Sequence, residues 1–387
     1  MKRNFQKMDK LLLVLMIGFC ILGLVMVFSS SSVSALLRYK VSSDYFFKKQ
    51  LTAMIVGFVV GLIVLGVNTK YYKLFGYLGI ILSFIALVYV LYKGIVVHNA
   101  KSWLDLGLFK IQPIEYVKTI YIIFMAVYYN FLVQRNVKLL APYFLPLGVA
   151  IVLAVLISLQ PDLGGAAIIL GISFFTFLSV PVVSSNIRKI IRILVVGAII
   201  AVFSFFAFGQ NILTSERLSR FNFQNPCSRY RDKDGSGYQV CNGFIAISNG
   251  GLLGLGLGRS TQKYLYLPDS HTDFIFPIVC EELGSLVGAL VIIFYGLLLF
   301  RMYRIAKQAD NLRTSILAYG AFWYFAMHIL VNLLGVLALM PLTGVPLTFL
   351  SYGGSHIINA IVIIFILERV TIENKDDKLN RAIKSFK

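Results

Sequence analysis

Long apolar runs separated by short polar segments dominate the sequence. Ten such runs occupy residues 11–29, 50–67, 74–92, 114–133, 143–159, 163–181, 190–208, 274–300, 314–338 and 351–368. Each run is close to the roughly 20 residues that a helix needs to cross the hydrocarbon core of a bilayer. The pattern predicts an all-α, polytopic membrane protein whose ten transmembrane helices form one bundle. Because no linker divides the runs, residues 1–387 are predicted to be a single domain.

The composition agrees with a membrane protein. Of the 387 residues, 58% are hydrophobic and 14% are charged, which is more apolar side chain than a soluble fold of this size can bury. The first run is longer than the apolar core of a signal peptide and nine more runs follow, so we expect an uncleaved anchor. The net charge is +19, but the basic residues are scattered between apolar runs. This distribution favours membrane topology over nucleic-acid binding, and no nucleic-acid partner is expected.

The charges also predict the orientation. An even number of spans places both termini on one side of the membrane. With a cytoplasmic N-terminus, the inner segments hold most of the 36 Lys and Arg residues, and the acidic residues are mostly on the outer side. We therefore expect both termini to be cytoplasmic, and residues 209–273 to form a large extracytoplasmic loop between the seventh and eighth spans.

Acidic residues occur where several predicted helices begin on the outer side. Glu115 follows Pro113 in the first turn of the fourth run and lies three residues before Lys118, so the two side chains share a helix face and can pair. Asp162 begins the sixth run. Outward helix N-termini offer free N–H groups and partial positive charge, which suit a phosphate or pyrophosphate. The functional interpretation is that the Glu115–Lys118 pair orients a substrate in a cavity; alternatively, it is purely structural.

Residues 264–284 change from a polar loop to an apolar run that carries Glu281 and Glu282. A carboxylate at the mouth of a hydrophobic span is costly to hold, so Asp273 is a candidate functional residue. Alternatively, Thr272 or Asp273 is only a helix N-cap. His271 is either a second acid or base, since its reference pKa is near 6.5, or a hydrogen-bonding loop residue that shapes the site.

Irregular segments lie on both sides of this run. Residues 244–258 are apolar and glycine-rich but too short to cross the membrane, so we expect them to lie in the interface or to re-enter, unless they are a plain loop. Residues 340–354 contain prolines and glycines that stop the ninth helix. Such backbone is tolerated at membrane depth only where protein or a watery cavity covers it.

The cysteines and histidines add little chemistry. Cys227 and Cys241 share the large loop, and whether they form a disulfide is left open; Cys20 and Cys280 are predicted packing residues. The sequence contains no CxxC motif, and the histidines other than His271 have no metal-ligand spacing.

Several short segments, taken together and in order, resemble the SEDS family (shape, elongation, division, sporulation). They cover nearly the whole chain and are Ala100-Lys101-Ser102-Trp103-Leu104, Gln112-Pro113-Ile114-Glu115, Lys118, Gln160-Pro161-Asp162-Leu163-Gly164, Gly237-Tyr238-Gln239, Ala246-Ile247-Ser248-Asn249-Gly250-Gly251, Gly256-Leu257-Gly258, Gln262-Lys263, Leu267-Pro268-Asp269-Ser270-His271-Thr272-Asp273-Phe274-Ile275-Phe276, Glu281-Glu282-Leu283-Gly284, Asn332, Pro341-Leu342-Thr343-Gly344 and Ser351-Tyr352-Gly353-Gly354. The chain departs from the family at Ile114, Asp269 and His356, where the family often has Ser, Glu and Ser. Gln262-Lys263 favours the division branch, FtsW, which the chain resembles most, whereas Thr343-Gly344-Val345-Pro346-Leu347 favours the elongation branch, RodA.

The resemblance implies an activity, partners and a site. SEDS proteins are peptidoglycan glycosyltransferases that polymerise lipid II at the outer face of the bacterial cytoplasmic membrane. They work with a class B penicillin-binding protein, which cross-links the strands, and with other divisome or elongasome membrane proteins. The family's essential acid falls on Asp273, which is predicted to be catalytic. The predicted substrate-binding residues are Glu115, Lys118, Asp162, Trp103, Arg217, Lys263, His271, Gln239 and Ser351.

The mechanism expected from this resemblance is general base catalysis. Asp273 would accept the proton of the acceptor 4-hydroxyl, and Lys118 with the loop cations would stabilise the pyrophosphate leaving group. A divalent cation, Mg or Mn, bridging the pyrophosphate and carboxylates is a further expectation. The alternatives are a RodA-like polymerase for elongation, a lipid II flippase and a non-catalytic scaffold. Charges crowded at one face favour surface chemistry over transport.

Overall fold

The structure is a computed structural model that describes residues 2–97, 100–105, 107, 110–192, 227, 236–268 and 270–385. Among these residues, eight helical segments are long and apolar enough to cross a membrane. They are α2 (Lys10–Leu37), α3 (Tyr45–Gly66), η1 with α4 (Thr69–Tyr71, Tyr72–Lys93), α5 (Pro113–Gln134), η2 with α6 (Ala141–Phe144, Leu145–Ser158), α13 (Ser285–Lys307), α14 (Leu312–Val336) and α15 (Gly354–Ser385). A shorter apolar helix, α7 (Leu163–Leu178), matches the sixth predicted run. Most of the seventh run, 190–208, lies outside the described residues.

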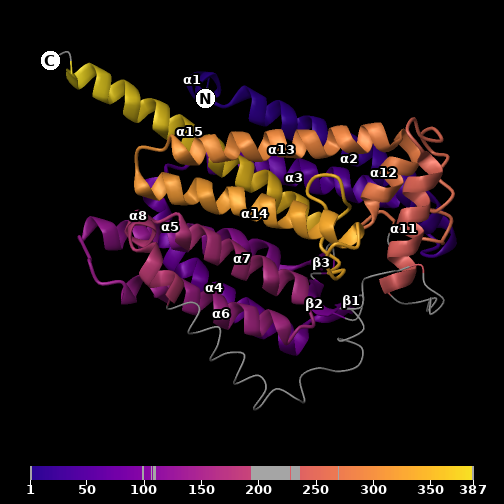
Figure 1. Cartoon of the computed structure of the whole chain (residues 1–387), viewed down its shortest axis with the longest axis horizontal. Coiled ribbons are helices and arrows are strands. Elements are labelled where there is room, and N and C mark those ends of the chain that lie inside the picture. Colours follow the sequence, from indigo (N-terminus) through magenta and orange to yellow (C-terminus); the bar gives the residue numbers. More distant parts are fainter. Residues whose placement is uncertain are drawn as a thin grey trace.

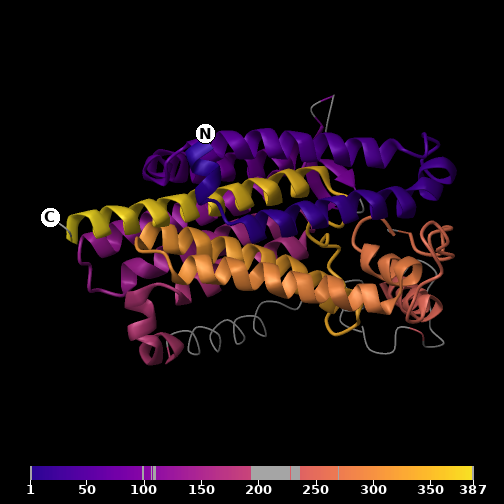
Figure 2. The same ribbon diagram turned by 90° about the horizontal axis from the view of Figure 1, so that it is seen from above.

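The long helices run side by side along one axis (Figure 1). Helix α15 packs along α3, α5 lies between α4 and α14, and α13 lies against α14. Both termini lie toward the end of the bundle opposite the loops around α11 (Ser236–Gly250) and α12 (Ile275–Leu283), as the perpendicular view also shows (Figure 2). This arrangement agrees with the prediction that the two termini share a side of the membrane.

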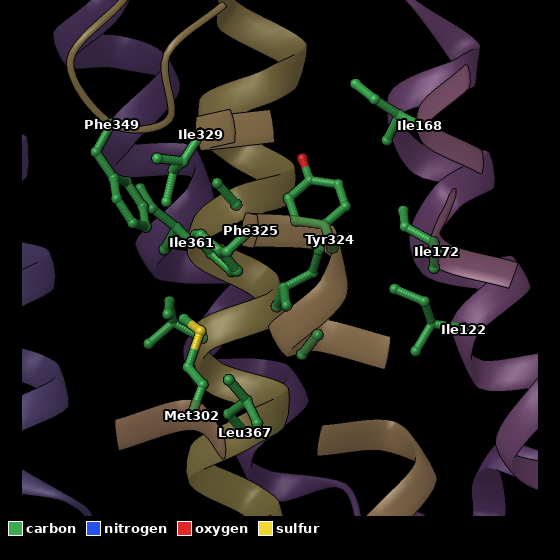
Figure 3. Packing of buried hydrophobic residues seen from close by; sticks show 14 of the residues in the cluster. Ile122, Ile168, Ile172, Met302, Tyr324, Phe325, Ile329, Phe349, Ile361 and Leu367 are labelled. Carbon is green, nitrogen blue, oxygen red and sulfur yellow. The ribbon is translucent and has the colours of Figure 1, made fainter. Parts of the chain in front are cut away.

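Helices α14 and α15 form the centre of the bundle. The most apolar stretches of these two helices are 72% and 83% buried, whereas those of α2, α3 and α13 are 28–39% buried. Figure 3 shows Tyr324, Phe325 and Ile329 of α14 among the side chains of this core. The outer helices keep apolar side chains such as Ile63 and Ile293 exposed, as expected for surfaces that face lipid.

Three elements lie where the sequence predicted only loops. Helix α2 continues to Leu37 instead of ending near residue 29, because Ser29, Ser30 and Ser31 are buried against the rest of the bundle. Between α4 and α5, strands β1 (Ile95–Val97), β2 (Ala100–Asp105) and β3 (Lys110–Ile111) form a small antiparallel sheet in the order β1-β2-β3. Helix α11 occupies part of the predicted large loop.

The eighth predicted run, 274–300, is not one helix. It divides at Gly284 into α12 and α13, and Gly284 has a φ of 91°, a conformation that strongly favours glycine. Segment 251–256 packs against this break: Leu255 N donates to the Glu281 carbonyl (2.9 Å), and Ser285 N donates to the Gly251 carbonyl (2.9 Å). A Cβ on Gly284 would lie 2.2 Å from the Leu252 carbonyl oxygen. The prediction of one continuous span was therefore wrong, because backbone from a distant segment satisfies the broken helix ends.

The same contacts show how residues 244–258 fold, while their position relative to the membrane stays a prediction. Residues 244–250 belong to α11, which packs on α12, and residues 251–258 form turns at the α12–α13 junction. A disulfide joins Cys227 to Cys241 of α11, which answers the question that the sequence left open. Cys20 and Cys280 are buried free thiols, as predicted for packing residues.

Candidate functional site

Asp273 lies just before α12, with 8% of its surface exposed. Asn332 of α14 donates from Nδ2 to two backbone carbonyls, those of Asp273 and Val345, both at 2.8 Å. Thr272 Oγ1 lies 3.2 Å from Asp273 Oδ1, and a Cβ on Gly344 would lie only 3.9 Å from Asp273 Oδ2. The carboxylate is therefore held beside the irregular segment 340–353. The N-cap position of α12 is Phe274, not Thr272 or Asp273 as the structural alternative required.

His271 and Ser351 lie where the loop before α12, segment 340–353 and α3 meet. Tyr352 N donates to the His271 carbonyl (2.8 Å), and the His271 ring lies 4.6 Å from the Phe46 ring of α3 and 5.7 Å from the Tyr352 ring. Gln50 Nε2 of α3 donates to the Ser351 carbonyl (3.0 Å). Both predicted residues are buried and fix the backbone around Asp273.

Asp162 is the N-cap of α7 and accepts a hydrogen bond from Gly165 N at 2.7 Å. Burial raises the pKa of its carboxyl, while the Gly165 N–H and the charge of Lys118 oppose that rise. A Cβ on Gly164 would lie 2.9 Å from the Thr343 carbonyl oxygen, so the start of α7 packs directly against residue 343. The segment 343–345 thus has the α7 N-terminus and Asp273 as neighbours.

Glu115 and Lys118 form the ion pair that their spacing predicted. Lys118 Nζ lies 2.7 Å from Glu115 Oε1, and the lysine is 1% exposed. Two further groups reach Glu115 Oε2, namely His356 Nδ1 at 3.1 Å and the Tyr324 hydroxyl at 3.3 Å. His328 Nε2 lies 3.0 Å from the lysine ammonium. The pairing prediction is confirmed, and the ammonium is fully enclosed by protein.

The sequence gives no sign of chemistry for His328 and His356, yet both contact this pair. They come from α14 and α15, so no spacing in the sequence could signal their meeting. With Glu115 they form the one group of three metal-type ligands found among the described residues, with ligand atoms within 4.8 Å of one another. The Lys118 ammonium is within hydrogen-bonding distance of Glu115 and His328, so this cluster is built around a lysine cation rather than a metal ion.

Lys263 lies in a second buried ion pair. Its Nζ is 2.9 Å from Glu282 Oε1 and 2.7 Å from the Gly258 carbonyl oxygen, and the residue is 3% exposed. Ser29 Oγ of α2 donates to the same carboxylate at 2.7 Å. Glu282 is nine residues after Asp273, so this pair is roughly 13 Å further along the α12 axis at 1.5 Å per residue. Lys263 thus links the loop that contains it, residues 258–263, to α12 and α2. This link lies at a distance from Asp273.

The side chain of the neighbouring Glu281 binds the same loop, mainly through the backbone N–H groups of the loop. Its carboxylate accepts hydrogen bonds from Thr261 N (3.1 Å) and Gln262 N (3.3 Å), and from the hydroxyl of Thr261 (2.8 Å). The two acids that the sequence placed inside a span are therefore satisfied by residues 258–263, which fold over the end of α12.

The remaining predicted residues lie elsewhere. Trp103 is half-buried in β2, opposite Ile95, and Gln239 is half-buried in α11. Arg217 lies outside the described residues. The structure thus gathers Asp273, His271 and Ser351 around segment 340–353, with Asp162, Glu115 and Lys118 at the adjoining ends of α5 and α7.

This architecture is similar to known proteins. A chain from a peptidoglycan synthase complex superimposes with a TM-score of 0.75 at 24% identity, covering 95% of this chain and 98% of that one. The rod shape determining protein RodA of Thermus thermophilus gives a TM-score of 0.64 at 24% identity, covering 95% and 97%. At this level of identity these two likenesses concern the fold.

The sequence comparisons are more specific. The probable peptidoglycan glycosyltransferase FtsW of Bacillus subtilis (strain 168) is 36% identical over 400 aligned positions, which cover 100% of this chain and 97% of that protein. Stage V sporulation protein E of the same organism is 34% identical and covers 94% and 96%. The profile of the FtsW/RodA/SpoVE family, described as cell cycle protein, matches residues 9–376. The chain therefore belongs to the FtsW/RodA/SpoVE family of multi-pass membrane proteins.

Proposed function

We propose that this protein is a peptidoglycan glycosyltransferase that polymerises lipid II into glycan strands at the outer face of the cytoplasmic membrane during septal wall synthesis. The relatives named FtsW support the activity and the role in division. The observation that carries the proposal is the position of Asp273. Asp273 precedes α12 at the end of the bundle away from both termini, and the Asn332 bridge ties its backbone carbonyl to the 340–353 segment.

The reaction joins two sugars. The acceptor 4-hydroxyl oxygen forms a bond to the anomeric carbon of the donor, and the bond from that carbon to the undecaprenyl pyrophosphate oxygen breaks. Asp273 takes the hydroxyl proton, and the pyrophosphate leaves with the electron pair. A positioned general base contributes roughly 10²–10⁴-fold to such a step. Asn332 and Gly344 have positioning roles, because Asn332 holds the Asp273 backbone and Gly344 lies beside the carboxylate.

Helix ends supply charge for the leaving group. Helices α5 and α7 begin beside segment 343–355: Gln112 N donates to Ser355 Oγ at 3.0 Å, and Gly164 packs on Thr343. The partial positive charge at both N-termini is directed toward this region and favours a pyrophosphate there. Lys118 adds a cation near the start of α5, where it is paired with Glu115 and contacted by His328.

A divalent cation fits this arrangement. Mg²⁺ is usually bound through one or two carboxylates together with substrate phosphates. Asp273 and Asp162 border the same segment, 343–345, and would hold such an ion, which would supply charge neutralisation for the pyrophosphate. The partner we propose is a class B penicillin-binding protein, supported by the likeness to a chain of a peptidoglycan synthase complex.

The test is Asp273→Asn in the full-length protein, purified with its cognate penicillin-binding protein and given labelled lipid II. We expect glycan-strand synthesis to fall at least 100-fold, in line with the loss of a general base. Asp44→Asn is the matched control, because Asp44 is a carboxylate at the start of α3 and pairs with Lys48, whose side chain is 69% exposed. Substantial polymerisation by Asp273→Asn would remove this residue from the role. Flipping of lipid II in liposomes without polymer would favour a transporter instead.

A further inference from the structure

A cavity of about 420 Å³ lies at the end of the bundle that carries both termini, far from Asp273. It is bounded by the start of α2, the last turns of α13 and the charged part of α15. The lining residues that decide what it can bind are Asp9, Lys10, Leu11, Arg301, Lys375 and Lys378. Its volume is within the range of small-ligand sites, about 300–1,000 Å³.

The lining is strongly cationic. Arg301 pairs with Asp9, whose own backbone N–H donates to Glu368 at 2.7 Å. This pair leaves three ammonium groups, those of Lys10, Lys375 and Lys378, and none of them has an ion-pair partner in the described part of the chain. The three lysines line the cavity and are exposed, and the Lys375 ammonium lies 3.5 Å from the Met8 carbonyl oxygen.

Arg301, which lines the cavity, also has one donor without a partner in the described part of the chain. Arg301 Nε is buried and has no hydrogen-bond partner among the described residues, although the guanidinium is anchored through its other nitrogen to Asp9. Burying a polar group without a partner costs about 1–3 kcal/mol. Arg301 therefore lines the cavity with a guanidinium whose hydrogen-bonding capacity is only partly used.

An apolar surface continues from the cavity. Leu11 of α2 lines it and is 39% exposed, and Val14, one turn further along the same helix, is 64% exposed. These side chains face the region that hydrocarbon would occupy around a membrane helix. A ligand with a phosphate head and an acyl tail matches both surfaces at once, whereas free phosphate matches only the first.

We propose that this cavity binds the phosphate of an anionic phospholipid headgroup, with the lysines and Arg301 around the phosphate and the acyl chain along α2. Basic pockets between transmembrane helices are suited to such headgroups. The site is separate from the polymerisation chemistry and does not depend on it.

The experiment is native mass spectrometry of the full-length protein with phosphatidylglycerol or phosphatidylethanolamine, in parallel with thermal unfolding. We expect one phosphatidylglycerol to be retained preferentially. In the triple variant Lys10→Gln/Lys375→Gln/Lys378→Gln, its affinity should fall by about five-fold per lysine, or on the order of 100-fold in total. The control is Arg304→Gln/Lys307→Gln, which removes two exposed cations from the same end of α13 that do not line the cavity.

The outcomes separate clearly. Selective loss in the triple variant, with the control within two-fold of wild type and equal melting temperatures in phosphatidylethanolamine, supports the site. Equal losses in both variants would mean general surface attraction and overturn it. If millimolar inorganic phosphate raised the melting temperature as much as phosphatidylglycerol did, the occupant would be a soluble phosphate, and the lipid assignment would be overturned.

Discussion

Two buried acid–lysine pairs occur in this protein, and they are built differently. Glu115 and Lys118 lie three residues apart on one helix, and the other groups around them are side chains from α14 and α15. Glu282 and Lys263 are 19 residues apart, and their surroundings include backbone carbonyl and N–H groups of a loop. The first pair joins regular helices to one another, whereas the second fastens an irregular loop to a helix end.

The two ion pairs also differ in how many contacts the remaining residue keeps when its partner is removed. Glu115 keeps two further contacts, from His356 and Tyr324, when Lys118 is removed. Lys263 keeps only a carbonyl and a hydroxyl when Glu282 loses its charge. Removing one partner of a buried ion pair typically costs about 3–5 kcal/mol. We therefore expect the loop pair to be the more sensitive of the two.

The largest effect should come from Glu282→Gln. The variant leaves the Lys263 ammonium buried without a countercharge, so the free energy of unfolding should fall by about 4–5 kcal/mol. Hydrogen exchange in residues 258–263 should rise at the same time. Chemical denaturation in detergent and hydrogen-exchange mass spectrometry measure the two effects.

The double variant Glu282→Gln/Lys263→Met is the control for this prediction. It removes both charges and should recover much of the lost stability. A Glu282→Gln protein as stable as wild type would mean that the pair contributes nothing to holding the loop.

Lys118→Met should cost less, about 3 kcal/mol, because Glu115 retains its contacts with His356 and Tyr324. If Lys118 supplies charge for the leaving group, lipid II polymerisation should fall in a variant that is still folded. Glu115→Gln/Lys118→Met tests the pairing itself. If the double variant were less stable than the sum of the two single changes, the account of the pair as mutually compensating would be wrong.

His356→Ser tests the contribution of the histidines. The change removes one of the groups around Glu115 and should lower the free energy of unfolding by about 1 kcal/mol. His328→Gln is the comparison, because a glutamine can still accept from Lys118. A loss above 3 kcal/mol for His356→Ser would show that the histidine does more than complete the coordination of the carboxylate.

The smallest effect should be that of Asp162→Asn. Burial raises the pKa of Asp162 above its ordinary value of 3.8, so the ionised form disfavours the folded state and the protonated form does not. The asparagine variant keeps an acceptor for Gly165 N. It should be more stable than wild type at pH 7, within about 0.5 kcal/mol, and this advantage should vanish as the pH falls below about 4. A larger advantage in acid would reverse the sign and contradict the prediction.

Local spacing predicted the features that depend on one helix. The apolar runs located the spanning helices, and the three-residue spacing of Glu115 and Lys118 predicted their ion pair. The features that failed depend on distant backbone. Gly284 breaks the eighth run because segment 251–256 supplies hydrogen-bond partners for the broken ends, and no pattern within 274–300 indicates that partner.

The residues of the candidate site also fall into two groups, those that the local sequence indicates and those that only the fold brings together. Asp273 came from the resemblance of its motif, and the sequence placed it correctly at the start of an apolar helix. His328 and His356 were missed because they lie on different helices and meet only after α14 and α15 pack. Lys263 was predicted from its positive charge and from the Gln262-Lys263 segment of the resemblance, and only the fold shows that Glu282 neutralises it.

Helix α15 has a consequence for communication through the membrane. At 1.5 Å per residue, its 32 residues from Gly354 to Ser385 extend about 48 Å, against roughly 30 Å of hydrocarbon. Its first turn carries Ser355 and His356, and its last turns project beyond the bundle (Figure 1). A protein that binds the projecting end would hold one end of a continuous helix whose other end adjoins the segment beside Asp273. Pulling or rotation at that end would be transmitted along the bundle without any intervening hinge.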